Sequence, residues 1–187
     1  MMSSVKHLNK YFKELLEKEK YQNYTLYTIV DSAINREFTK ALHMQEDNSY
    51  KILLKEPLVQ KVEEVAPYLV KLNLEEEYTQ KLMEKGFATN WLTYLVSYKN
   101  IDELQQELQE MIMPYSEQHQ REILFRFYDP RNLENYIMIH EAEELVEMFE
   151  DVGGAFLTVD SDEPTFLHLY SKDKNFEIIE LEEESVV

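Results

Sequence analysis

The densest group of chemically capable side chains lies between residues 126 and 131, where the sequence reads Arg-Phe-Tyr-Asp-Pro-Arg. Two arginines bracket one aspartate, and a guanidinium binds a carboxylate through paired, charge-assisted hydrogen bonds. Asp129 followed by Pro130 is also a typical helix start, because aspartate caps a helix and proline fits its first position. The pattern favours a structural lock at a strand-to-helix junction. The alternative is a surface that recognises an acidic or carboxylate group.

Catalytic constellations are absent from the sequence. There is no nucleophile elbow, no Walker loop and no dinucleotide fingerprint, and a chain with three glycines hardly forms a phosphate loop. The 37 acidic residues mark out no particular carboxylate pair for hydrolysis. We therefore expect a protein that is not an enzyme and that uses no cofactor. A hydrolase with a carboxylate pair is the second alternative.

A metal site finds little support either. His140-Glu141 begins like a zinc-binding H-E-x-x-H motif, but Glu144 stands where the second histidine belongs. Tetrahedral zinc needs three or four well-spaced ligands. We expect no metal, and we read this segment as a helix start with acidic residues that favour its dipole.

Trp91, Tyr94 and Tyr98 lie in one run and raise the question of an aromatic stacking platform. Their place inside a strand-like segment favours packing in the core for all three side chains.

The net charge of −18 excludes two classes of partner. A strongly negative surface repels nucleic acid and anionic membranes, and it suits a basic partner or simple solubility. The charge is uneven, because residues 1–40 hold seven basic and five acidic residues and the remainder holds twelve and thirty-two. The negative surface therefore belongs to the body of the protein, and we expect acidic residues in 141–151 to steer a basic partner.

Localisation is predicted from what the sequence lacks. It contains no cysteine, no apolar stretch near 18 residues and no apolar core of a signal peptide at its start. These features predict a cytoplasmic protein with no membrane insertion.

Hydrophobic periodicity and turn residues predict an α+β fold, a mixed β-sheet flanked by helices with a small C-terminal antiparallel β meander. The predicted helices cover 4–20 with Ser4 as cap, 33–43 capped by Asp31 or Ser32, 75–85 stopped by Gly86, 101–112 capped by Asn100 or Asp102, 130–138 and 141–150. The predicted strands cover 24–30, 50–54, a short segment after Pro67, 90–98 as a central strand, 121–128, and 155–159, 165–171 and 175–180 in the meander.

The same pattern divides the chain into three parts. Residues 1–22 form an N-terminal amphipathic helix, 23–150 an α/β core, and 151–187 the meander and an acidic tail.

Four segments are together similar to a known family. They read YTIVDSA at 27–33, APYLVKL at 66–72, WLTYLVS at 91–97 and LFRFYDPR at 124–131. In order and approximate spacing they resemble the effector adaptors of type VI secretion systems, also called effector chaperones or Tap/Tec proteins. The residues that match the family's motifs are Asp31, Pro67, Tyr68, Leu69, Arg126, Tyr128, Asp129, Pro130 and Arg131.

The resemblance implies a non-enzymatic adaptor that binds a cognate effector and the spike protein VgrG. It implies that most of the motif residues are fold determinants. Many members of the family carry a larger helical lobe after the motif domain, whereas here only 37 residues follow residue 150 and they are β-rich in character. An adaptor of this kind needs a groove or an exposed apolar patch. The first alternative is an acidic immunity protein that binds a basic toxin.

Overall fold

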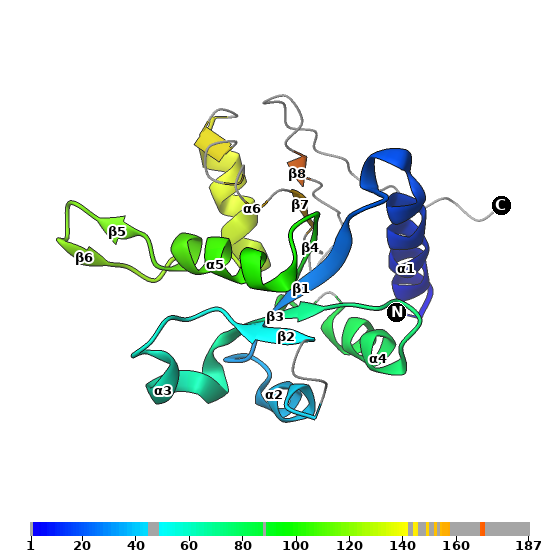
Figure 1. Cartoon of the computed structure of the whole chain (residues 1–187), viewed down its shortest axis with the longest axis horizontal. Coiled ribbons are helices and arrows are strands. Elements are labelled where there is room, and N and C mark those ends of the chain that lie inside the picture. The colour runs from blue at the N-terminus through cyan, green and yellow to red at the C-terminus, as the bar shows by residue number, and fades with distance from the viewer. Residues whose placement is uncertain are drawn as a thin grey trace.

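The α+β class is confirmed by a computed structural model, which describes residues 2–44, 49–87, 89–141, 144–145, 149, 152, 154–157 and 169–170. A six-stranded sheet in the order β2-β3-β1-β4-β7-β8 forms its centre, and a separate two-stranded ribbon pairs β5 with β6 (Figure 1). Every described strand pair is antiparallel, so the predicted mixed sheet is antiparallel at all of these pairings.

The elements alternate along the chain up to residue 139. The strands are β1 Thr25–Asp31, β2 Tyr50–Ile52, β3 Pro67–Lys71, β4 Leu92–Ser97, β5 Tyr115–Ser116, β6 Arg121–Glu122, β7 Gly154–Leu157 and β8 Leu169–Tyr170. The α-helices are α1 Met2–Glu17, α2 Arg36–Leu42, α3 Val59–Val62, α4 Glu77–Gly86, α5 Ile101–Ile112 and α6 Pro130–Ile139, and the short 3-10 helices are η1 Glu19–Tyr21 and η2 Glu63–Val65. No described helix has the length and apolar character needed to cross a membrane.

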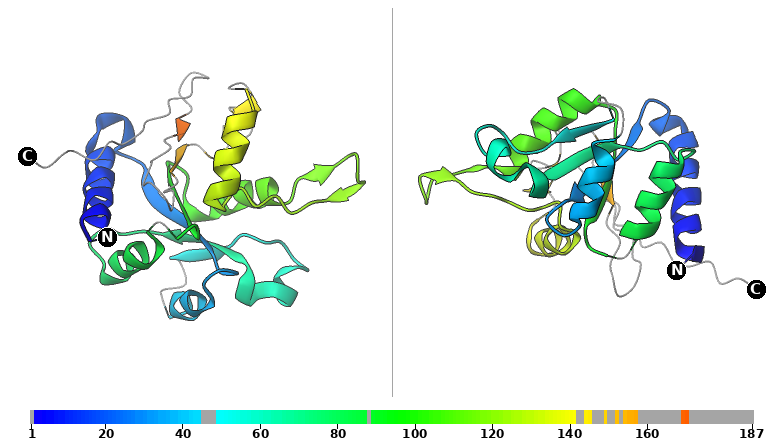
Figure 2. Two further views of the ribbon diagram at one scale, coloured as in Figure 1. Left: turned by 180° about the vertical axis from the view of Figure 1, so that it is seen from behind. Right: turned by 90° about the horizontal axis from the view of Figure 1, so that it is seen from below.

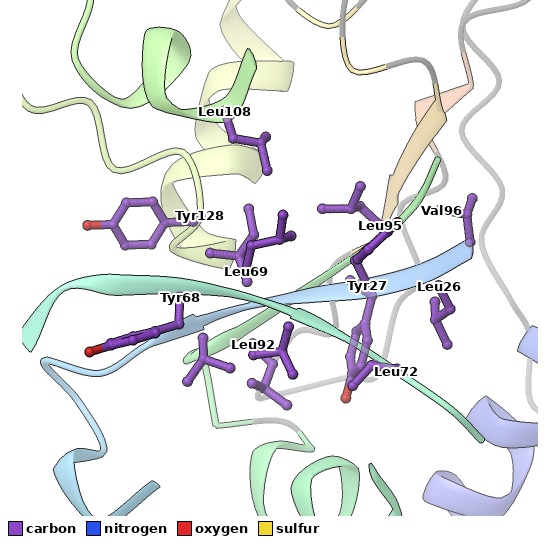
Figure 3. Close-up of a cluster of buried hydrophobic side chains, with 14 of the residues drawn as sticks. Leu26, Tyr27, Tyr68, Leu69, Leu72, Leu92, Leu95, Val96, Leu108 and Tyr128 are labelled. Carbon is purple, nitrogen blue, oxygen red and sulfur yellow. The ribbon is translucent and has the colours of Figure 1, made fainter. Parts of the chain in front are cut away.

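The two faces of the sheet carry different helices (Figures 1 and 2). Side chains alternate along a strand, so Tyr68 and Leu69 of β3 point to opposite faces, as Figure 3 shows. Leu69 lies on the face covered by α5 and α6, together with Leu108 of α5. Tyr68 lies on the face covered by α1, α2 and α4. We call these the α5 face and the α1 face.

Helix α1 packs through the predicted apolar stripe, since Val5, Leu8, Phe12 and Leu15 are buried. The Phe12 ring lies 5.2 Å from the ring of Tyr94, which fixes the helix against the α1 face. The helix begins at Met2, so Ser4 is not its cap, because nothing in the sequence before Ser4 interrupts the helix.

Strand β4 confirms the prediction of a central strand. All six of its residues are buried, and it pairs with β1 on one side and β7 on the other. A strand buried on both faces reads as a continuous apolar run, and the run Trp91–Val96 has this character.

Helix α5 begins as its sequence predicts. The Asn100 side chain accepts hydrogen bonds from the backbone N–H of Asp102 and of Glu103 at 3.0 and 3.1 Å. The Glu103 carboxylate accepts one from the backbone N–H of Asn100 at 3.0 Å, which completes a capping box. Leu104 and Leu108 are fully buried against the sheet.

The predicted strand 121–128 is wrong in extent and in place. Only Arg121–Glu122 is a strand, and it pairs with β5 in a hairpin outside the main sheet. Residues 123–126 continue this hairpin, with the N–H of Ile123 bonded to the Pro114 carbonyl at 3.1 Å and that of Phe125 to the Ile112 carbonyl at 2.8 Å. The segment is extended, as its residues favour, but its partner is the chain that leaves α5.

Two helix boundaries also differ from the prediction. Asp31 and Ser32 do not cap α2, whose cap position is Asn35, because the Asp31 carboxylate is bound elsewhere. Gly86 is the last residue of α4 and not the residue after it. A Cβ atom there would lie 2.0 Å from the Leu92 Cδ1 atom, so the close approach of α4 to β4 requires glycine.

The C-terminal strands extend the main sheet. Strand β7 pairs with β4 and β8 pairs with β7, so the predicted meander begins as expected but is continuous with the core. The predicted strand 175–180 lies outside the described residues. Of the predicted helix 141–150 the structure describes Glu141, which is not helical, and Glu144, Leu145 and Phe149, which are.

We expect Asn100→Ala to lower the free energy of unfolding by about 1 kcal/mol, because two backbone donors lose their acceptor. Urea denaturation followed by circular dichroism measures this loss. Asn100→Asp, which keeps the capping oxygen, is the control and should stay close to wild type. Equal losses in both variants would contradict a role for the cap.

Candidate functional site

The four segments that resemble the adaptor family meet at the end of β1. Asp31 pairs in register with Pro67, the first residue of β3. Its backbone N–H donates to the Trp91 carbonyl at 2.9 Å, and its carboxylate accepts a hydrogen bond from Arg126. One residue therefore contacts all three other segments, although they are far apart in the sequence.

Asp31 holds a buried charge. Its side chain is 1% exposed, and that of Arg126 is 38% exposed. The second carboxylate oxygen accepts the backbone N–H of Ala33 at 3.1 Å, which forms a tight turn after β1. A buried carboxylate with a guanidinium partner and a backbone donor is satisfied, whereas the same carboxylate without the guanidinium is costly.

Asp129 is a second buried carboxylate that is paired with an arginine. Its two oxygens accept hydrogen bonds from Arg131 Nε at 2.9 Å and from the Arg131 guanidinium at 2.7 Å, a bidentate pair. The same carboxylate caps α6 by accepting the backbone N–H of Arg131 at 3.1 Å, with Pro130 at the first helical position as predicted. Arg126 lies 4.0 Å from Asp129, so Asp31, Arg126, Asp129 and Arg131 alternate in sign. We call them the charged chain.

The charges in this chain are fixed by their neighbours. Burial alone would raise the pKa of the Asp129 carboxyl, but the hydrogen bonds and charge of Arg131 hold it below its ordinary value. Burial opposes the charge of Arg126, yet the Asp31 carboxylate raises the pKa of the guanidinium. Burial raises the pKa of Tyr128 to about 12, so this phenol stays protonated. Both carboxylates are occupied by arginine, which is the geometry expected of a structural lock.

The remaining motif residues also serve packing. Leu69 is fully buried, and Tyr68 donates from its hydroxyl to the Glu63 carbonyl at 3.0 Å. The Tyr128 carbonyl accepts a hydrogen bond from Thr93 of β4 at 2.7 Å. Ser97, which ends the third segment, donates to the Val152 carbonyl at 2.7 Å. These contacts attach the motif segments to the central strands.

An open apolar groove lies directly beside the motif. It encloses about 530 Å³ and is lined by Glu110, Met111, Pro114, Ile123, Leu124, Phe125 and Tyr136. Its lining therefore comes from the end of α5, the base of the hairpin and one face of α6. The hairpin and α6 both project from the sheet on this side of the molecule (Figures 1 and 2).

Aromatic contacts shape the wall of the groove on α6. The ring of Phe125 lies 5.1 Å from that of Tyr136, which in turn stacks on His140 with ring centres 3.8 Å apart. Leu124 is 53% exposed, a high value for an apolar side chain beside a core. The groove thus exposes apolar side chains on an otherwise acidic protein.

The other candidates from the sequence have different outcomes. Trp91 and Tyr94 are buried, as core packing predicts, but the same prediction is wrong for Tyr98, which is 58% exposed and meets Tyr24 edge to face. His140 lies 2.9 Å from the Tyr136 carbonyl through Nδ1. Within the described part of the chain, no group of three His, Cys, Asp or Glu residues is placed to hold a metal ion.

The sequence alone does not reveal the groove. Met111, Pro114 and Tyr136 carry no motif, and Ile123 to Phe125 read as a sheet strand. One signal is present: Pro114 follows the end of α5, and the polar run 115–122 comes next, which is typical of a hairpin that leads the apolar run 123–125 away from the sheet.

Residues 26–147 match the family model described as "Domain of unknown function (DUF4123)". The matched region covers more than half of the chain and includes all residues of the charged chain. Neither the curated proteins nor the solved structures contain a match to the sequence.

We expect Arg126→Gln to lower the free energy of unfolding by about 3 kcal/mol, because it leaves the Asp31 carboxylate buried without a counter-charge. Urea denaturation measures the loss. The double variant Asp31→Asn/Arg126→Gln should recover part of it, since the buried charge is then gone. Strictly additive losses would show that the two side chains do not interact.

The lowered pKa of Asp129 predicts a pH dependence of stability. Since the pKa of this carboxyl is lower in the folded than in the unfolded protein, its stabilising effect is complete above the ordinary value of 3.8 and is lost as the pH falls through the folded value. Asp129→Asn keeps a capping oxygen but has no charge for Arg131. Urea midpoints should therefore differ most between wild type and this variant near neutral pH and converge in acid. A constant difference would contradict the ion pair.

Proposed function

Because this chain belongs to the DUF4123 family, we propose that it is a non-enzymatic adaptor that binds a cognate effector and helps to load it onto the VgrG spike of a type VI secretion system. In this role it acts in the cytoplasm, before the effector is exported.

The observation that carries the proposal is the convergence of the four adaptor-like segments on Asp31. Each segment resembles the family at a residue that the fold uses to hold the others, through the Asp31–Arg126 pair, the register with Pro67 and the bond to Trp91. Residues that match the family by chance are not expected to lie in one contact network.

The groove supports a binding role. An adaptor needs an accessible apolar surface, and two residues that line this groove, Leu124 and Phe125, belong to the segment that carries the family motif. The carboxylates of the charged chain are held by arginines, which argues against their use as catalytic acids or bases.

Co-expression with the effector and VgrG proteins encoded beside this chain tests the proposal. We expect a complex that survives size-exclusion chromatography and that requires a segment of the effector. Absence of binding to both proteins would overturn the proposal and would favour the acidic immunity protein, which is then tested against the neighbouring toxin.

We expect the acidic surface to control the rate at which the effector binds. Glu117 and Glu122 are exposed on the hairpin beside the groove. Charge reversal of both to lysine should slow association, measured by surface plasmon resonance at low salt, more than it accelerates dissociation.

A matched control for this measurement changes the same charge elsewhere. Glu63 and Glu64 are exposed on η2, on the α1 face, and their reversal to lysine should slow association less. Equal rates for wild type and the hairpin variant at low salt would contradict electrostatic steering toward the groove.

A further inference from the structure

We propose that the groove between α5, the hairpin and α6 binds a basic amphipathic segment of the effector, with apolar side chains in the groove and lysine or arginine residues at its rim. This inference rests on the proposed adaptor function and names the chemistry of its partner.

The apolar character of the groove extends beyond its lining. Ile139 lies one helical turn after Tyr136 on α6 and is 76% exposed, so α6 continues the apolar surface past the groove. Ile123 and Leu124 in the groove itself are 39% and 53% exposed, so apolar area is exposed to water both in the groove and on α6. A partner with a matching apolar face would remove this surface from water.

The groove is held in shape before any partner arrives. Its floor, residues 123–126, is bonded to the chain that leaves α5, because the N–H of Ile123 donates to the Pro114 carbonyl and that of Phe125 to the Ile112 carbonyl. The proline ring restricts the backbone at Pro114. Arg126 anchors the far end of the floor to Asp31 in the sheet. A preformed groove loses little conformational entropy on binding, which favours affinity.

Those same bonds indicate how a partner is recognised. The N–H groups of Ile123 and Phe125 are already used, and the Arg126 carbonyl accepts a hydrogen bond from Asn132 at 3.0 Å. These groups are engaged within the fold, and the groove itself is lined mostly by apolar residues. A partner that fills it does so with apolar side chains, as an amphipathic helix does when it lies in an apolar groove.

The acidic residues around the groove favour a basic partner. Helix α5 contains four acidic residues and no basic one, and Glu110 lines the groove itself. Burial and, to a smaller extent, the nearby Glu144 carboxylate raise the pKa of the Tyr136 phenol, so a carboxylate flanks the wall on α6 as well. Glu110 is paired with Lys55, and Arg121 is exposed on the hairpin, so the acidic excess around the groove comes from Glu117 and Glu122 on the hairpin and from Glu144.

The negative charge around the groove disfavours two other possible occupants of the groove. A second copy of this chain carries the same net charge of −18 and would be repelled. The chain's own last residues read Glu-Leu-Glu-Glu-Glu-Ser-Val-Val and are acidic as well. A basic segment of another protein fits both the apolar lining and the rim.

Fluorescence anisotropy with a designed peptide tests the groove directly. The probe is a labelled helix of about two heptads with leucines on one face and lysines elsewhere, compared with a peptide of the same composition in scrambled order. We expect saturable binding of the amphipathic peptide to the full chain. The scrambled peptide should bind at least tenfold more weakly, about 1.4 kcal/mol.

A matched pair of variants locates the site. Leu124→Arg and Ile34→Arg add the same charge at apolar residues that are 53% and 47% exposed, but only Leu124 lines the groove. We expect Leu124→Arg to weaken binding of the probe at least tenfold and Ile34→Arg to leave it within about twofold. Circular dichroism confirms that both variants are folded. Equal effects of the two substitutions, or equal binding of both peptides, would overturn the proposal.

Co-purification with the neighbouring effector separates this inference from the proposed function. If Leu124→Arg loses the complex and Ile34→Arg keeps it, the result supports both the adaptor role and the groove as its binding site. A complex that persists in Leu124→Arg leaves the adaptor role standing and removes the groove as its site. If wild type captures no effector but binds the probe through Leu124, the groove is a binding site and the adaptor role fails.

Discussion

The ion pair between Asp31 and Arg126 is the interaction on which the rest of this structure depends. Asp31 ends the strand in the middle of the sheet, and its carboxylate is withdrawn from water. A buried carboxylate is tolerated only when a counter-charge and donors surround it, so the fold must bring an arginine to this point from a distant segment. That requirement fixes where the chain returns to the sheet after α5 and its hairpin. It also fixes the start of α6, because Asp129 lies three residues after Arg126.

The groove follows from this constraint. Arg126 is bonded to Asp31 in the sheet, and the N–H groups of Ile123 and Phe125 are bonded to the carbonyls of Pro114 and Ile112, so the run 123–126 lies beside the sheet instead of within it. Apolar residues that would be buried in a seventh strand therefore face solvent at Ile123 and Leu124. A fold that leaves apolar side chains exposed departs from local consistency, and such departures concentrate at functional sites. Both arginines of the motif bind carboxylates of the chain itself, as the structural interpretation predicts, and the groove beside them follows from that lock.

How far the sequence predicts this molecule depends on the range of each interaction. The helix start at Asn100, which is one of two predicted caps, the Asp129–Pro130 helix start and the continuous apolar run of β4 are local patterns, and each of these elements is confirmed. The run 121–128 shows the limit, because its alternation predicts an extended chain but not the strand beside which it lies. Asp31 was expected to cap a helix, since a sequence cannot reveal that an arginine 95 residues away occupies its carboxylate. The groove was missed for the same reason, because its walls come from three elements that only the fold brings together.

The apolar lining and the acidic rim of the groove affect different steps of binding. Apolar contacts act at short range and oppose dissociation, whereas surface charges act over a Debye length of about 8 Å at physiological salt and mainly affect the rate of encounter. Arg126, Arg131 and Lys55 are held in internal pairs with Asp31, Asp129 and Glu110. Exposed Arg121 offsets only part of the negative charge that Glu117 and Glu122 bring to the hairpin. Changes in the lining and changes at the rim should therefore alter different rate constants. Solubility accounts for the acidic surface, but it does not account for a preformed apolar groove within that surface.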